Sequence, residues 1–127
     1  MPYDPTVSVS VSLAALAEQV ARFGDLVYAI TADEHGKGHV VSVTAGWQGD
    51  QLVMAAGRRT SSNAETTGSI TLLWPAPPGE PYSLIVDGDA HVDAHAGLVG
   101  VRPTRAVLHR VARADPGLPS CVTVLDT

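Results

Sequence analysis

The residues best suited to binding a ligand stand together near the middle of the chain, in the segment GRRTSSN (residues 57–63). The guanidinium groups of Arg58 and Arg59 offer N–H donors that match phosphate or carboxylate oxygens. Hydroxyl groups and the N–H groups of a helix start would add further donors. The alternative is a polar loop whose serines only cap a short helix. The candidate ligand-binding residues of this segment are Arg58, Arg59, Thr60, Ser61, Ser62 and Asn63.

Other residues whose side chains could bind a metal or act in catalysis are less well placed. The sequence HVDAH puts His91, Asp93 and His95 on one face of a strand, because side chains alternate along it. A zinc site needs three or four convergent ligands, which one strand rarely supplies, so we expect a polar outer face and no metal. His109 stands among valines and is expected to be an interior or interface residue. Cys121, the only cysteine, sits in an apolar run and is expected in the core.

Composition limits the possible classes of protein. The chain has 127 residues, 45% of them hydrophobic and 17% charged, which is typical of one globular domain spanning residues 1–127. The net charge of −5 argues against nucleic-acid binding. Neither a signal peptide nor an apolar run of membrane-spanning length is visible, so we expect a cytoplasmic protein. Lys37 is the only lysine, so nearly all the positive charge is guanidinium.

The elements that must position these residues are mainly strands. Ser10 or Ser12 can cap an N-terminal helix that Gly24 ends. Alternating and β-branched runs then predict strands joined by tight turns, with Gly88 as a bulge and the proline-rich residues 75–81 as a loop. His35 and His39 flank the first turn and are expected to be exposed. The predicted strands are residues 26–32, 39–47, 51–56, 69–74, 82–95, 105–113 and 120–126, with a short helical segment at 61–67.

This order predicts a mainly β fold: a small antiparallel barrel of six to seven strands, with an N-terminal helix and a short helix after the third strand. The run YAITADEHGKGHVVSVTAGWQGDQLVMAAG, the polar loop with Asn63, and GSITLLWP together resemble the flavin-binding split β-barrel family. That family includes pyridoxamine 5'-phosphate oxidase-like proteins and the F420 (deazaflavin)-dependent reductases of actinobacteria. The resemblance covers roughly residues 12–114. It implies a homodimer with the cofactor in a cleft between subunits.

The resemblance also assigns roles to residues. It implies that the phosphate site is the segment from Arg58 to Asn63, and that Val43 and Thr44 pass under the isoalloxazine ring. Many members carry a lysine about three residues before the Asn, where this chain has Thr60, and we expect no other lysine to replace it. With fewer cations the site should favour the singly charged phosphodiester of F420 over the phosphate of flavin mononucleotide (FMN).

The resemblance therefore implies an F420- or FMN-dependent oxidoreductase that transfers hydride to an unknown small molecule. F420 is favoured because the Ala-, Gly-, Val- and Arg-rich composition suits actinobacteria. In such proteins the cofactor carries the chemistry and the protein binds and orients it, so no catalytic residue is assigned. The alternative is a non-catalytic split barrel that binds another small ligand or none.

Overall fold

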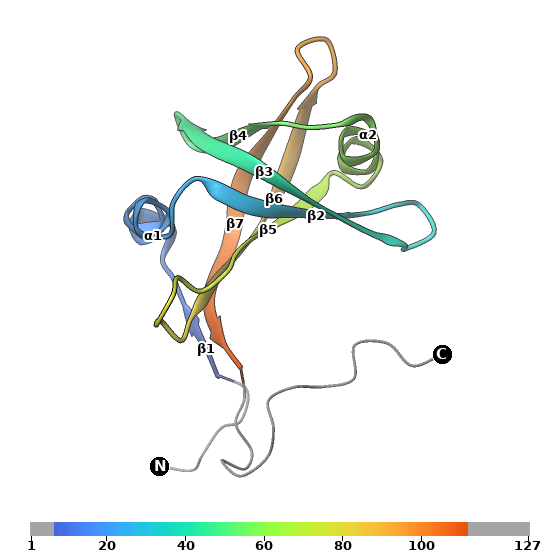
Figure 1. The fold of residues 1–127 in the computed structure, drawn as a ribbon. Coiled ribbons are helices and arrows are strands. Elements are labelled where there is room, and N and C mark those ends of the chain that lie inside the picture. The colour runs from blue at the N-terminus through green and yellow to red at the C-terminus, as the bar shows by residue number, and fades with distance from the viewer. Residues whose placement is uncertain (1–6, 112–127) are drawn as a thin grey trace, which may run out of the picture.

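The computed structural model describes residues 7–111, which form seven strands, two α-helices and one short 3-10 helix (Figure 1). Tight turns at glycines with positive φ join several of the elements. In chain order the elements are β1 (Val7–Ser10), η1 (Leu13–Ala15), α1 (Leu16–Phe23), β2 (Leu26–Ala32), β3 (Gly38–Gln48), β4 (Gln51–Ala55), α2 (Arg58–Thr67), β5 (Ser69–Trp74), β6 (Ser83–Asp93) and β7 (Leu98–Arg110).

Six of these strands close into an antiparallel barrel. The order around the barrel is β2, β3, β4, β7, β6 and β5, and β5 pairs again with β2. β1 pairs only with β7, where Val7 lies opposite Arg110. The predicted fold class is therefore confirmed: a mainly β, antiparallel barrel with an N-terminal helix and a second helix after the third barrel strand in chain order.

The core fills the barrel interior, because strand residues alternate between the inside and the outside. Leu52 and Met54 of β4, together with Leu84 and Val86 of β6, are almost completely buried. Trp74 ends β5 in the interior, and its indole N–H donates a 2.8 Å hydrogen bond to the carbonyl of Gly24. This bond fixes the start of β2 and the end of β5 relative to each other.

The N-terminal helix forms as the capping pattern predicts. The Ser12 hydroxyl accepts a hydrogen bond from the Ala15 N–H at 3.2 Å, and η1 leads directly into α1. Leu16 and Val20 point into the core, and Gly24 ends the helix with a φ of 99°. Leu13, in η1, is 52% exposed.

One strand, β7, differs markedly in length from the prediction. β7 begins at Leu98, several residues before the predicted start, because the β6–β7 hairpin pairs along its whole length. The predicted bulge at Gly88 is confirmed by a register shift between Asp87 and Gly88. The predicted closing strand at 120–126, with Cys121, lies outside the described residues. Within the described part of the chain no helix is long and apolar enough to cross a membrane.

Candidate functional site

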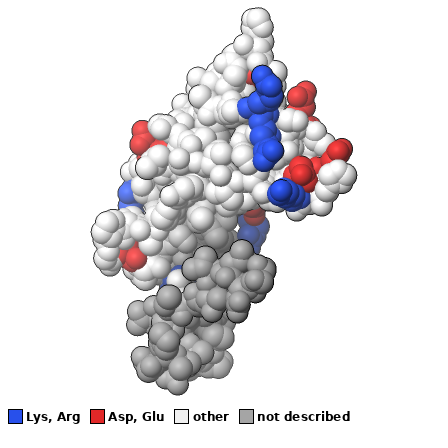
Figure 2. Space-filling view, turned by 45° about the vertical axis from the view of Figure 1, so that its right-hand side comes forward, with Lys and Arg blue, Asp and Glu red and all other residues white. Residues whose placement is uncertain are grey.

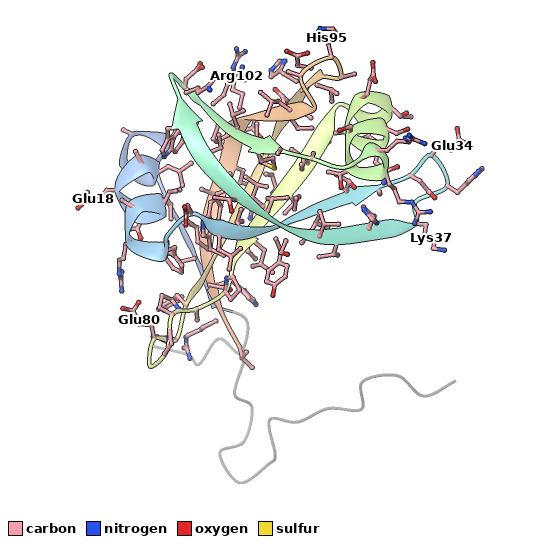
Figure 3. All side chains as sticks on the ribbon, turned by 45° about the horizontal axis from the view of Figure 1, so that its top comes forward. Glu18, Glu34, Lys37, Glu80, His95 and Arg102 are labelled. Carbon is pink, nitrogen blue, oxygen red and sulfur yellow. The ribbon has the colours of Figure 1, made fainter. Side chains whose placement is uncertain are left out.

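The turn between β2 and β3 is organised by one carboxylate. Asp33 Oδ1 accepts hydrogen bonds from the backbone N–H groups of His35, at 2.8 Å, and Lys37, at 2.9 Å. Gly36 takes a positive φ of 81°, which a residue without Cβ adopts without strain. Asp33 and Lys37 also pair through the backbone. The turn therefore holds Lys37 at a fixed place at the end of the hairpin (Figure 3).

Helix α2 lies beside the end of this hairpin, on the side of the barrel away from α1 (Figure 1). Gly57 is its N-cap residue, and no side chain caps its first turn. The first N–H groups of a helix have no partner within the helix and carry its positive dipole end. Asn63 fixes α2 to β2, because its amide donates a 3.2 Å hydrogen bond to the buried Thr31 hydroxyl.

The turn and the helix enclose a small polar pocket, which we call the anion pocket. It has a volume of about 130 Å³, the liquid volume of about four waters. Arg59 and Asn63 come from α2, and the other side chains come from the β2–β3 hairpin. The lining residues are Asp33, Lys37, Gly38, His39, Arg59 and Asn63. Figure 2 shows basic and acidic atoms gathered together on this side of the molecule, beside a largely uncharged surface.

A more apolar groove of about 330 Å³ adjoins the anion pocket, and Gly38 lines both. The groove runs across the ends of β2 and β5, with Ile30 and Thr71 opposite each other in register. Its size lies in the range of small-molecule sites. Its lining residues are Ile30, Thr31, Ala32, Gly38, Thr67, Ser69, Ile70 and Thr71.

The charges of the anion pocket partly cancel. Lys37 and Arg59 are cations, and Asp33 is an anion. The Lys37 backbone N–H holds the pKa of the Asp33 carboxyl below its usual value. The N–H of His35 and the positive charges of Lys37 and Arg59 act in the same direction, and desolvation opposes them. Asp33 is therefore ionised near neutral pH, and the pocket carries only a small net positive charge.

The structure brings together only part of the predicted segment. Arg59 and Asn63 line the anion pocket, whereas Arg58 and Ser62 are exposed outside it and Ser61 is half-buried. Thr60, at the place of the family's lysine, is 1% exposed and faces the interior. α2 begins at Arg58, three residues earlier than predicted, so these side chains point in different directions around a helix.

The two predicted ring contacts lie elsewhere on the barrel. Val43 packs against the core, and Thr44 is exposed on the outer face. Neither lines the anion pocket or the adjoining groove. Val43 is five residues beyond Gly38 along β3, a distance of about 17 Å at the usual rise of a strand.

Sequence reasoning missed Asp33, Lys37 and His39. The sequence offered no lysine near Thr60, but Lys37 lines the same pocket as Arg59 from more than twenty positions away in the chain. His35 is exposed as predicted, whereas His39 is half-buried in the pocket wall. A signal was available: β3 leads away from the turn and β4 leads back, so the helix after β4 lies toward the end of the hairpin.

The described residues contain no group of three or more His, Cys, Asp and Glu side chains that could hold a metal ion. His91 and His95 lie along the β6–β7 hairpin and are exposed, as their alternation predicts. His95 lies at the tip of that hairpin (Figure 3).

No protein-family model matches the chain. Two mycobacterial proteins do match: Uncharacterized protein Mb0449c of Mycobacterium bovis and Uncharacterized protein MT0457 of Mycobacterium tuberculosis. Each is 38% identical over 103 residues, which cover 69% of this chain and 72% of the relative.

Several solved structures share the fold. An FAD-binding protein from Mycobacterium smegmatis has a TM-score of 0.61 and 17% identity, covering 82% of this chain and 98% of that one. The heme storage protein HutZ from Vibrio cholerae has a TM-score of 0.59 and 12% identity, covering 79% and 96%. An F420 reductase has a TM-score of 0.54 and 15% identity, covering 65% and 88%.

The fold is therefore that of a split β-barrel protein. Within that class, the chain belongs to the same family as the mycobacterial proteins Mb0449c and MT0457.

Proposed function

We propose that the protein binds a flavin-type cofactor whose phosphate lies in the anion pocket and whose ring lies in the adjoining groove. One observation carries the proposal. Arg59 and Asn63 of α2 converge with Lys37 and His39 of a distant hairpin on one small pocket. Phosphate oxygens match this set of donors. The neighbouring groove is large enough for a planar apolar ring.

Of the flavin-type cofactors, F420 fits the charge of the pocket better than FMN. FMN ends in a phosphate monoester with up to two negative charges, whereas F420 has an internal phosphodiester with one. The negative charge of Asp33 offsets one of the two positive charges of Lys37 and Arg59. A second negative charge on the ligand therefore finds little positive charge to balance it, and removing that charge from water is costly. The mycobacterial relatives agree with the choice of F420 by association only.

With this cofactor the protein would be a cytoplasmic oxidoreductase that transfers hydride to a small molecule. The cofactor would supply the hydride chemistry. The chain's own part would be to bind the phosphate through Arg59, Lys37 and the N-terminus of α2, and to orient the ring against β2 and β5. This division of labour requires no acid–base pair in the protein.

A non-catalytic split barrel is the second candidate function. The observation that favours it is the likeness in fold to the heme storage protein HutZ, which has a higher TM-score than the F420 reductase. The two candidates differ in whether a bound flavin-type cofactor is reduced and reoxidised.

The proposal also includes a homodimer. The long β6 offers little exposed apolar surface to a partner, because buried and half-buried residues alternate up to Gly88 and the exposed residues beyond it are polar. The outer face of β2 and β3 supplies that surface instead: Leu26, Tyr28 and Val40 are exposed there. Ile30, the register partner of Val40, also lines the groove. A second copy on this face would border the ring.

Side-by-side fluorescence titrations with F420 and FMN at one ionic strength test the proposal. We expect F420 to bind at least about tenfold more tightly. Arg59→Ala should weaken binding by about 1.5–3 kcal/mol, the usual contribution of a charge-assisted hydrogen bond. The matched control Arg58→Ala, next in the chain but outside the pocket, should leave affinity nearly unchanged. Binding of neither cofactor would reject the proposal, and equal losses in both variants would reject the assigned pocket.

A further inference from the structure

A large cleft of the described structure lies on the other side of the barrel from the anion pocket. It has a volume of about 650 Å³ and lies between the N-terminal helices, the β3–β4 turn and β7. Figures 1 and 3 both show α1 and α2 on opposite sides of the barrel. None of the residues that line the anion pocket or the adjoining groove lines this cleft. Its lining residues are Leu13, Leu16, Ala17, Trp47, Gly49, Asp50, Arg102 and Pro103.

The floor of the cleft is apolar, although much of it faces solvent. Leu13 is 52% and Trp47 37% exposed, which makes them two of the large apolar side chains that the barrel leaves uncovered. They come from separate elements, η1 and β3, and Pro103 of β7 adds a third flat apolar surface. Rigid surfaces of this kind bind aromatic rings well, because little side-chain entropy is lost on contact.

The rim of the cleft carries one cation with weak partners. Arg102 Nε lies 3.6 Å from Asp50 Oδ2, which is longer than a hydrogen bond, and both side chains are more than half exposed. Such exposed pairs contribute about 0–1 kcal/mol. Asp89, the register partner of Arg102 on β6, is also exposed. A ligand carboxylate can therefore take the guanidinium fork at little cost, in the bidentate geometry that Arg favours.

We propose that this cleft is a second small-molecule site, which binds an aromatic carboxylate with its ring against Trp47 and Leu13 and its carboxylate on Arg102. Two features carry the proposal: an uncovered apolar floor of ligand size, and a guanidinium at its rim that donates no hydrogen bond to Asp50. The site does not depend on the proposed function, because it shares no residue with the anion pocket or the groove.

The test is a titration of the full chain with 3-phenylpropanoate, followed by tryptophan emission. Trp47 lines the cleft, while Trp74 is buried and reports on the barrel interior. We expect a saturable change in emission that Trp47→Phe removes. The neutral amide of the same acid should bind at least about tenfold more weakly, since it forms no charge-assisted pair. Octanoate, an acid of the same charge without a ring, should bind more weakly than the aromatic acid.

Three variants distinguish the contribution of the Arg102 charge from that of the apolar floor of the cleft. Arg102→Gln should weaken binding of the acid about tenfold and leave binding of the amide unchanged. Arg105→Gln is the matched control, because Arg105 lies on the same strand with a similar exposed partner, Asp87 at 3.5 Å, and does not line the cleft. Leu13→Ser should weaken acid and amide alike, with the melting temperature showing that the fold is kept.

The proposal is overturned if the acid and its amide bind equally, if Arg102→Gln binds the acid as tightly as the unmodified chain, or if no saturable binding occurs up to about 10 mM. The last result would also be expected if a second copy of the chain covered the cleft. Tighter binding to Asp50→Asn would support the proposal, since that change removes the carboxylate that competes for Arg102.

Discussion

At the scale of single residues, the anion pocket depends on a lysine that lies far from the arginine in sequence. Lys37→Ala should weaken cofactor binding by about three- to tenfold, less than the loss of Arg59, because an exposed ammonium acts as a hydrated point charge without a planar fork. Glu34→Ala is the control, since Glu34 stands in the same turn but does not line the pocket.

The double variant of Lys37 and Arg59 would show whether both bind one phosphate. Side chains that share a ligand group are coupled, so their effects should not add. Strict additivity of the two losses, measured by the same fluorescence titration, would contradict a shared phosphate.

Asp33 provides the sharpest test of the charge argument. Asp33→Asn keeps a side-chain oxygen for the backbone N–H groups of His35 and Lys37 but removes the negative charge. Because the pKa of Asp33 is lowered, that charge is fully present near neutral pH in the unmodified protein. At pH 8 the variant should bind both cofactors more tightly, FMN more than F420, so the preference for F420 should shrink. An unchanged ratio of the two dissociation constants would show that Asp33 does not set the preference.

At the scale of elements, the β6 bulge allows β6 and β7 to lie close together. A Cβ on Gly88 would lie 2.5 Å from Val101 Cγ1 and 2.6 Å from the Arg102 carbonyl oxygen. The second contact is with backbone, which cannot move aside. Gly88→Ala should therefore lower the free energy of unfolding by about 1–3 kcal/mol, as overpacking does. Gly46→Ala in β3 is the control, because nothing lies within 4 Å of its added Cβ. Equal denaturation midpoints for the two variants would refute the close contact.

The features that the sequence predicted depend on local signals, and the features that it missed depend on contacts between elements that are distant in the chain. Strand positions followed from alternation, and the start and end of the N-terminal helical segment from Ser12 and Gly24, because these signals are local. The sequence also singled out Arg59 and Asn63, which line the anion pocket, because they belong to one polar segment. Lys37 was not, because only the pairing of β2, β3 and β4 brings the first turn near α2. The burial of Thr60 was missed because the helix began earlier than its serines suggested.

At the scale of the whole molecule, the uncovered apolar face on β2 and β3 predicts the homodimer. Leu26 is 65%, Val40 58% and Tyr28 42% exposed on neighbouring strands. Apolar side chains gathered on one sheet face in this way mark an interaction surface. The groove that holds Ile30 continues this face, so a partner copy seated here would also shield a bound ring from water.

Sedimentation of the chain at a concentration on the order of tens of micromolar should give the mass of two chains, because the interfaces of obligate dimers survive such dilution. Leu26→Asp and Val40→Asp each place a charge in the proposed interface, where its desolvation is unfavourable, and should give the mass of one chain with the barrel still folded. Leu13→Asp changes a leucine of η1 that is 52% exposed and lies outside the β2–β3 face, and it should leave the dimer intact. A single-chain mass for the unmodified protein, or dissociation by Leu13→Asp alone, would move the interface away from β2 and β3. Because the groove borders this face, the two interface variants should also bind cofactor more weakly than Leu13→Asp does.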